Sequence, residues 1–232
     1  MSKLLTVSIE KKMGDFNLKV CFEVADQILV LWGPSGSGKT TTLECLAGLK
    51  KPDRGEIKLL EEVLFSTCAR VDLPARSRQI GYLFQDHNLF PHMTVDQNIK
   101  YGMPRKQGIM PPLNHYRLME QFGIEHLGQR YPYQISGGEQ QRAALIRALV
   151  TQPRLLLLDE PFSSLDQQAH FSLREVIKKL HAQWHIPVIL VTHDKGDAQV
   201  LGDKVIALDH GKQITTDSSP DLADHRLAVQ TK

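Results

Sequence analysis

Short apolar runs alternate with longer amphipathic stretches along most of the chain. The apolar runs are rich in Leu, Ile and Val and are apolar on both faces, which is typical of strands in a mostly parallel sheet. The amphipathic stretches predict helices, and strand–helix alternation predicts an α/β fold. The expected strands are Gln27–Trp32, Ile80–Phe84, Leu155–Leu158, Val188–Val191 and Val205–Leu208, and the expected helices are Lys39–Leu49, Asp96–Tyr101, Leu113–Phe122, Gly137–Thr151, Gln167–Gln183 and Lys195–Leu201.

The first part of the chain has a different pattern. Leu4–Glu10 and Asn17–Glu23 alternate apolar and polar residues, which predicts half-exposed antiparallel strands, and Gly55–Leu59 with Val63–Ser66 predicts a hairpin. The middle, 87–151, carries mainly helical signals, interrupted by a proline-rich segment at Met103–Pro112. We therefore expect one unit built from an antiparallel β region and a parallel-sheet core at 1–86 and 152–232, with a helical subdomain at 87–151.

Composition narrows the class of protein without choosing a function. The chain has 232 residues, 41% of them apolar and 23% charged, and a formal net charge of +2. This near-neutral balance gives no reason to expect nucleic acid as a partner. Three scattered cysteines, Cys21, Cys45 and Cys68, indicate a reduced, cytosolic protein. We see neither a secretory leader nor an apolar run long enough to span a bilayer.

A glycine-rich loop lies between an apolar strand and a helix. Its residues fit the pattern G-x-x-x-x-G-K-[ST], whose consecutive N–H groups form a nest for phosphate at a helix N-terminus. We expect the Lys39 amine to reach the β- and γ-phosphates and the Thr40 hydroxyl to bind magnesium. The bland alternative is a turn that fits by chance, and the loop alone does not choose among kinase, GTPase, motor and transport ATPase. The nucleotide-binding residues expected here are Gly33, Pro34, Ser35, Gly36, Ser37, Gly38, Lys39, Thr40 and Thr41.

Two carboxylates, Asp159 and Glu160, end the buried strand that begins at Leu155. The carboxyl edge of a parallel sheet is where ligands of open α/β folds bind. Asp159 is placed to hold magnesium, and Glu160, on the opposite side of the strand, to polarise a water that attacks the γ-phosphate. Taken alone, the pair fits a solvated turn equally well.

A second run of small residues, Ser136-Gly137-Gly138-Glu139, precedes a strong helical pattern. Small residues at a helix N-terminus also suit an anion. Two phosphate-type sites far apart in one chain are explained if two copies pair head to tail, each run meeting the nucleotide of the other copy.

Together these segments resemble the ATPase subunits of ABC transporters, over roughly Leu4 to Gly211. Ile135–Arg142 is similar to the family's signature motif, and Gln85 looks like its glutamine loop, which contacts magnesium. Ser164-Leu165-Asp166 resembles the D-loop that crosses the dimer, and His193 the switch histidine that contacts the γ-phosphate. The resemblance implies catalytic roles for Glu160, His193, Gln85 and Lys39, nucleotide contacts from Ser136, Gly137, Gly138, Glu139 and Asp166, and magnesium ligands in Thr40, Gln85 and Asp159.

The chain departs from the family pattern in three places. The signature begins with Ile135 instead of Leu, and Glu139 stands where Gln is frequent. The family commonly stacks adenine on an aromatic residue before the phosphate loop, and here the candidates are Met13 and Phe16. Either side chain fits a packing role under the sheet equally well.

Within the family, Pro74–Val95 is similar to bacterial importers of oxyanions, polyamines and iron, and Asn98–Met103 most resembles molybdate importer ATPases. The resemblance implies membrane permease subunits and an extracytoplasmic solute-binding protein as partners, with the chain peripheral on the inner face of the membrane. An apolar cluster would receive the permease, although a loop covered by its own helical insertion is the alternative. The cluster comprises Leu89, Phe90, Pro91 and Met93.

The sequence thus predicts a subunit that binds and hydrolyses ATP with magnesium and energises import. Many such subunits carry a C-terminal regulatory domain, which we do not find after Gly211. A soluble ABC ATPase for DNA repair or translation and a phosphate-loop kinase for a small molecule remain as alternatives. The kinase interpretation would leave Ser136–Gly138 and His193 without a task.

Overall fold

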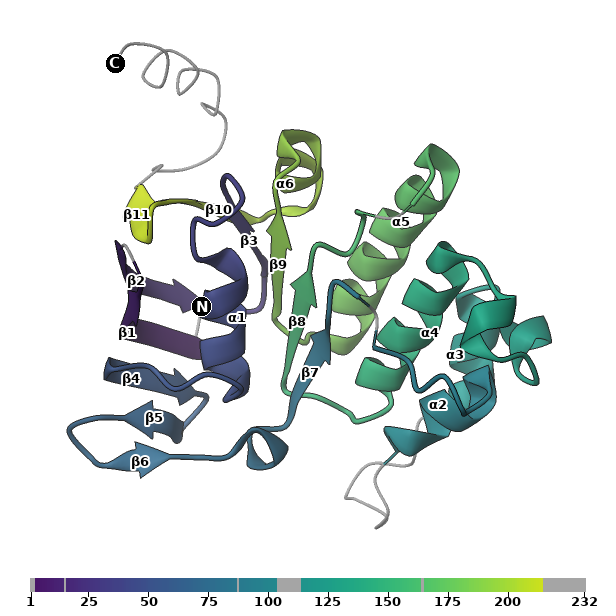
Figure 1. Cartoon of the computed structure of the whole chain (residues 1–232), viewed down its shortest axis with the longest axis horizontal. Coiled ribbons are helices and arrows are strands. Elements are labelled where there is room, and N and C mark those ends of the chain that lie inside the picture. The colour runs from purple at the N-terminus through teal and green to yellow at the C-terminus, as the bar shows by residue number, and fades with distance from the viewer. Residues whose placement is uncertain (1–2, 15, 87, 104–113, 164, 215–232) are drawn as a thin grey trace. The chain divides into compact units, whose positions relative to one another are not determined.

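The computed structural model describes residues 3–14, 16–86, 88–103, 114–163 and 165–214. The chain divides into two compact units, Met1–Arg78 with Pro187–Lys232, and Gln79–Ile186 (Figure 1). The boundaries between these two units, after Arg78 and after Ile186, differ from the bounds expected for the helical subdomain. A separate helical subdomain at 87–151 therefore stays a prediction. The expected loop at Met103–Pro112 and the D-loop residue Ser164 lie wholly or partly outside the described residues.

The first unit begins with the expected antiparallel strands. Strand β1 pairs with both β2 and β4, and β5 and β6 extend this edge (Figure 1). Alternate residues of β1, such as Leu5, Val7 and Ile9, are buried. The predicted alternation is therefore confirmed, because one face of these strands packs inward. The bounds are β1 Leu5–Met13, β2 Phe16–Val24, β4 Arg54–Leu59, β5 Glu62–Ser66 and β6 Val71–Asp72.

The same unit contains parallel strands around β3. Strand β3 (Ile28–Trp32) lies between β9 (Val188–Thr192) and β10 (Lys204–Asp209), parallel to both. Strand β11 (Lys212–Ile214) returns antiparallel to β10 and meets β2, which joins the two regions in the order β6-β5-β4-β1-β2-β11-β10-β3-β9. Every residue of β3 except Trp32 is buried, as predicted from a strand that is apolar on both faces. The helices here are α1 Lys39–Ala47 and α6 Lys195–Leu201, with a short 3₁₀ turn at Ala75–Ser77.

The second unit contains a parallel pair of strands and most of the helices. Strand β7 (Ile80–Leu83) pairs in register with β8 (Leu155–Asp159), whose five residues are all buried. Helix α4 contacts α2, α3 and β7 (Figure 1). The helix expected from Leu113 begins at His115 instead, because Asn114 caps it by accepting bonds from Tyr116 and Arg117. The helices are α2 Val95–Tyr101, α3 His115–Gln121, α4 Gly137–Leu149 and α5 Gln167–Trp184, with 3₁₀ turns at Glu125–Leu127 and Pro132–Gln134.

The α/β fold class, with a parallel-sheet core, an antiparallel β region and a helical part, is confirmed. Within the described part of the chain, none of the helices combines the length and apolar character needed to cross a lipid bilayer.

Candidate functional site

The loop at residues 33–40 leaves β3 and leads into α1. Gly36 and Gly38 have φ angles of 79° and 103°, in the left-handed region that glycine adopts without strain. A Cβ on Gly33 would lie 2.1 Å from the Leu208 carbonyl oxygen, so the close approach of β10 requires a glycine there. The Gly211 N–H donates to the Ser37 carbonyl at 3.0 Å. The turn after β10 therefore braces the loop from outside.

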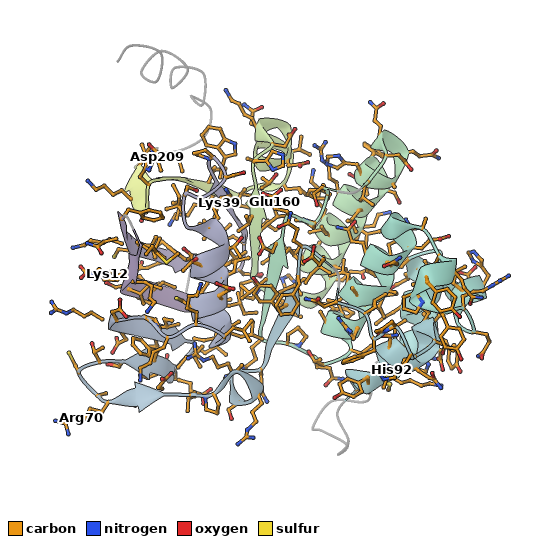
Figure 2. The ribbon with its side chains drawn as sticks, in the orientation of Figure 1. Lys12, Lys39, Arg70, His92, Glu160 and Asp209 are labelled. Carbon is orange, nitrogen blue, oxygen red and sulfur yellow. The ribbon has the colours of Figure 1, made fainter. Side chains whose placement is uncertain are left out.

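Lys39 folds across this loop at the N-terminal end of α1 (Figure 2). Its ammonium group donates to the carbonyl oxygens of Gly33 at 2.9 Å and Pro34 at 2.8 Å, and the residue is 5% exposed. The first N–H groups of a helix have no intrahelical partners and carry partial positive charge. A cation next to such a helix end, on a loop of glycines, is a site for phosphate. Thr40 is exposed and Thr41 buried on the first turn.

Phe16 lies beside this loop, and Met13 pairs with Phe16 at the end of the β1–β2 ladder. The Phe16 ring is 3.8 Å from the position of a Cβ on Gly38 and 2.5 Å from that of a Cβ on Gly211. It also meets the His210 ring edge to face, with centroids 6.5 Å apart. Of the two expected adenine-stacking candidates, only Phe16 is shown next to the phosphate loop.

His193 follows β9 in the same unit as the phosphate loop. Its side chain is exposed, and its backbone carbonyl accepts a bond from the indole N–H of Trp32 at 3.2 Å. Trp32 ends β3 and directly precedes Gly33, so it connects the base of the loop to the turn that carries His193. Sequence reasoning took Trp32 only as the end of an apolar strand.

Asp159 and Gln85 lie at the carboxyl ends of two paired strands in the second unit. Asp159 is 3% exposed and accepts a hydrogen bond from the Tyr82 hydroxyl at 3.2 Å. Gln85 is exposed, two residues past the end of β7. Because β7 and β8 are parallel and in register, both side chains belong to the same edge of this pair. Tyr82 was not expected, since its bond depends on that register across strands 77 positions apart.

Glu160 follows Asp159 with a φ angle of 49°, a left-handed backbone that costs a non-glycine residue about 1–2 kcal/mol. Two bonds from Ser163, one from its N–H at 3.2 Å and one from its hydroxyl at 3.1 Å, hold the Glu160 carbonyl. The Gln141 side-chain amide donates to the next carbonyl, that of Pro161. Gln141 is 1% exposed and lies on α4. The signature helix therefore fixes the backbone that carries Glu160, a link not anticipated from the sequence.

Ser136 caps α4 through a reciprocal pair of bonds with Glu139. The Ser136 hydroxyl accepts from the Glu139 N–H, and the Glu139 carboxylate accepts from the Ser136 N–H and hydroxyl, both at 2.8 Å. These bonds, the one from the Ser136 N–H foremost, lower the pKa of the Glu139 carboxyl. The first turn of α4 thus begins with an exposed Gly137 and a half-buried Gly138, next to a reciprocal cap.

The segment after Ser164 packs against this cap. A Cβ on Gly138 would lie 3.0 Å from Leu165, so a larger residue at Gly138 would displace that side chain. Asp166 begins α5 by accepting a bond from the Ala169 N–H at 2.8 Å. Its carboxylate therefore has a local capping role in this structure.

The expected magnesium ligands are all oxygen donors. Thr40 supplies a hydroxyl in the first unit, and Gln85 an amide and Asp159 a buried carboxylate in the second. Hydroxyl and carboxylate oxygens with water are what magnesium prefers, so the donor set fits that ion. Within the described residues there is no cluster of three or more His, Cys, Asp or Glu side chains that would hold a metal by itself.

The loop expected to receive a permease is tightly held. The buried Asn98 side chain accepts a hydrogen bond from the Phe90 N–H at 2.8 Å and donates one to the Phe90 carbonyl oxygen at 3.1 Å. Arg147 of α4 donates to the Asn88 carbonyl at 2.8 Å and lies 5.5 Å from the Phe90 ring centroid. Leu89 and Phe90 are therefore half-buried and Pro91 exposed.

A groove of about 720 Å³ opens beside this loop and α2. His92, which is labelled in Figure 2, is one of its lining residues. Tyr101, which is 62% exposed, and Met103 lie in this groove, and sequence reasoning missed both. The lining residues are His92, Met93, Gln97, Lys100, Tyr101 and Met103.

A family model described as ABC transporter matches residues 17–163. The chain is 42% identical over 208 residues to the Molybdate/tungstate import ATP-binding protein WtpC of Archaeoglobus fulgidus, covering 90% of this chain and 84% of that protein. It is 38% identical to the Probable sulfate/thiosulfate import ATP-binding protein CysA of Chlorella vulgaris, covering 96% and 94%. Against the Molybdenum import ATP-binding protein ModC of Haemophilus ducreyi, at 39% identity, it covers 92% of itself but 60% of the longer protein.

A solved structure has the same fold. A dimeric post-hydrolysis state of the ATP-binding cassette MJ0796, bound to ADP and Pi, superposes with a TM-score of 0.72 at 27% identity, covering 93% of this chain and 100% of that one.

Proposed function

The chain belongs to the ABC transporter family, and on that premise we propose that it binds and hydrolyses ATP as the energising subunit of an importer. The phosphate loop carries this proposal. Its Lys39 ammonium is buried against two carbonyl oxygens at the N-terminus of α1. That arrangement suits exchange of those carbonyls for the oxygens of a bound triphosphate.

The nucleotide binds along the loop of the first unit. The backbone N–H groups of residues 33–41, except at Pro34, which has none, surround the phosphates, and the Lys39 ammonium pairs with the β- and γ-phosphates. Adenine stacks on Phe16, which is next to Gly38 in the structure. Base–aromatic stacking is sequence-tolerant and worth about 1–3 kcal/mol. Phe16 therefore replaces the more frequent aromatic residue of the family at a different position.

Thr40, Gln85 and Asp159 would hold magnesium together with water and the phosphates. The ion supplies positive charge that offsets the charge developing on the transferred phosphoryl group. Within the chain, Tyr82 orients the Asp159 carboxylate through its hydroxyl. This hydroxyl and the burial of Asp159 keep the carboxylate in one place before the nucleotide arrives.

Glu160 and His193 serve the hydrolysis step. Glu160 accepts a proton from the attacking water while the water oxygen bonds to the γ-phosphorus. On the opposite side, the bond between the γ-phosphorus and the oxygen that bridges to the β-phosphate breaks, and ADP leaves. His193 hydrogen-bonds the γ-phosphate and keeps it in line. The left-handed backbone at Glu160, held by Gln141 and Ser163, fixes the direction of the carboxylate.

A second copy of the chain completes each site. Ser136, Gly137 and Gly138 of one copy meet the γ-phosphate bound by the other, since an exposed helix N-terminus suits that charge. The dimeric ADP-bound cassette supports the pairing of two copies. Glu139 and Asp166 lie beside this contact. ATP thus favours a closed dimer, and hydrolysis removes the preference.

Permease subunits dock at the groove beside Phe90 and α2, which places the chain on the inner face of the membrane. The groove brings together the exposed Tyr101 and the half-buried Met93 and Met103, and an accessible apolar cluster of this kind is typical of an interface. An extracytoplasmic protein would deliver the solute. The names of the relatives favour an oxyanion such as molybdate, tungstate or sulfate as the solute.

Steady-state ATP hydrolysis against protein concentration tests the proposal, with Glu160→Gln as the inactive comparison. We expect activity that rises more steeply than linearly, because the active species is a dimer, and that falls by about a thousandfold or more in the variant, because the proton acceptor is gone. The assays of wild type and variant both contain Mg²⁺.

Activity that stays proportional to concentration down to nanomolar protein, and is indifferent to Glu160→Gln, would contradict the proposal. Sizing the variant with and without ATP distinguishes a very tight dimer from a monomer. A variant that is monomeric both with and without ATP would overturn the proposal of a site shared between two copies.

A further inference from the structure

The turn that carries His193 is held on one side by its own residues. The Asp194 N–H donates to the Thr192 hydroxyl at 3.0 Å, and that hydroxyl donates to Asp197 Oδ2 at 3.4 Å. Asp197, which is 1% exposed, also donates its N–H to the Asp194 carboxylate at 2.9 Å, where Asp194 caps α6. These bonds fix Thr192 and Asp194 on either side of His193, and a further contact reaches the His193 carbonyl itself.

That contact comes from Trp32. Strands β3 and β9 are parallel and in register, with Trp32 opposite Thr192. The Trp32 indole N–H donates to the His193 carbonyl oxygen at 3.2 Å, one residue beyond the end of the ladder. The bond therefore continues the pairing of the two strands past their last residues, where the backbone ladder has stopped.

The position of Trp32 in the chain gives this bond its importance. Trp32 is followed directly by Gly33, whose carbonyl accepts from Lys39. A shift of Trp32 would thus move the first residue of the phosphate loop and the His193 turn together. Phe and Leu would fill the same space but offer no donor, since only the indole ring carries an N–H there.

We propose that Trp32 is a positioning residue that sets the His193 turn against the phosphate loop, so that the imidazole meets the γ-phosphate. This inference rests on the proposed role of His193 in hydrolysis. If the Trp32 ring served only to pack the end of β3, its N–H would have no effect on kcat. The two roles therefore predict different results for a ring without a donor.

Trp32→Phe, compared with wild type in steady-state hydrolysis of MgATP, tests the inference. We expect kcat to fall about three- to tenfold, the worth of one neutral hydrogen bond, with KM for ATP within about twofold. In a His193→Ala background the same substitution should lower kcat no further, because Trp32 acts through His193. Trp184→Phe, at the far end of α5, is the matched control for loss of a tryptophan, and it should leave both constants unchanged.

A second variant covers the case in which Trp32→Phe unfolds the protein. Incorporating benzothienylalanine at position 32, in the Trp184→Phe background, keeps the shape of the indole and removes only the N–H. We expect the same fall in kcat and an unchanged thermal midpoint.

Full kcat in this variant would overturn the inference, and so would an equal further fall on top of His193→Ala. Wild-type kcat in His193→Ala alone would instead refute the role of His193, which is part of the proposed function. The two failures are therefore distinguishable.

Discussion

Glu139 puts a negative charge next to the serine that is proposed to meet the γ-phosphate of the partner copy. The Ser136 hydroxyl donates to Glu139 at 2.8 Å, so its proton is already used within the chain. The Ser136 N–H and hydroxyl lower the pKa of the Glu139 carboxyl, which is therefore ionised at neutral pH. The Glu139 carboxylate competes with the γ-phosphate for the Ser136 hydroxyl, and its negative charge repels the phosphate.

Glu139→Gln should therefore strengthen the ATP-bound dimer. In a Glu160→Gln background, which arrests hydrolysis, we expect half-maximal dimer formation at an ATP concentration about two- to fivefold lower at pH 7. The lowered pKa means that the charge is present above this pKa and is lost as pH falls through it. The advantage of the variant should therefore shrink in acid. Light scattering across an ATP series measures it, and Glu120→Gln on α3 is the exposed control; equal curves for the two variants would contradict the competition.

Phe16 and Met13 are distinguished by their effect on ATP binding. Phe16→Ala removes the ring that lies beside Gly38, and we expect KM for ATP to rise about 5- to 20-fold with kcat little changed, because stacking stabilises bound ATP and the transition state equally. Phe16→Tyr should keep wild-type KM. Isothermal titration with a non-hydrolysable ATP analogue gives the same comparison as a binding constant. A larger rise in KM for Met13→Ala would assign the stacking role to Met13.

At the scale of elements, one buried arginine joins α1 to the segment that follows β6. Arg78 is 1% exposed and donates to the carbonyl oxygens of Cys45 and Leu46 at 2.9 Å, at the end of α1, and of Leu73 at 2.8 Å. Burial lowers the pKa of its guanidinium, and Asp72 at 3.3 Å opposes that effect. Arg78 thus replaces the missing hydrogen-bond donors at a helix C-terminus.

Arg78→Met should destabilise the first unit severely. The substitution removes the bonds from Arg78 to three carbonyl oxygens and its ion pair with Asp72, which retains Lys51, and we expect the free energy of unfolding to fall by about 3–5 kcal/mol. Urea denaturation followed by circular dichroism measures this change. Arg76→Met, two residues earlier and exposed, should stay within about 0.5 kcal/mol of wild type. Similar midpoints for the two variants would mean that Arg78 has no anchoring role.

Elements with a long, strong pattern could be predicted from the sequence. The apolar strands around Leu29 and Leu157 and the amphipathic helix at Gln167–Trp184 occur where expected, because burial on both faces or on one face determines their composition. Strands β6 and β11 have two and three residues, too few to show a period. They exist only because a neighbouring strand supplies hydrogen bonds.

The candidate site shows the same division. Residues in local motifs, such as Lys39 and Ser136, could be proposed from the sequence because the spacing within one loop or helix start carries the chemistry. The supporting residues Trp32, Tyr82 and Gln141 were missed because their bonds reach 161, 77 and 20 positions along the chain. Such bonds depend on strand order and register, which no local spacing contains.

At the scale of the whole molecule, each active site of the proposed dimer combines the phosphate loop of one copy with the signature of the other. Lys39 and Ser136 of one chain therefore belong to different sites. A head-to-tail dimer with twofold symmetry has two equivalent sites of this kind. Defects in these two residues should therefore complement one another between chains, which no arrangement with a self-contained site allows.

A mixture of two defective chains tests this directly. We expect Lys39→Ala and Ser136→Arg, each in a Glu160→Gln background, to remain monomeric with MgATP when alone, because every site in either homodimer carries one defect. Mixed, they form heterodimers in which one site carries both defects and the other is intact. Labelling one chain with a donor and the other with an acceptor dye should give energy transfer with MgATP and none with MgADP. Its absence, when the Glu160→Gln parent dimerises under the same conditions, would mean that the signature acts within its own chain.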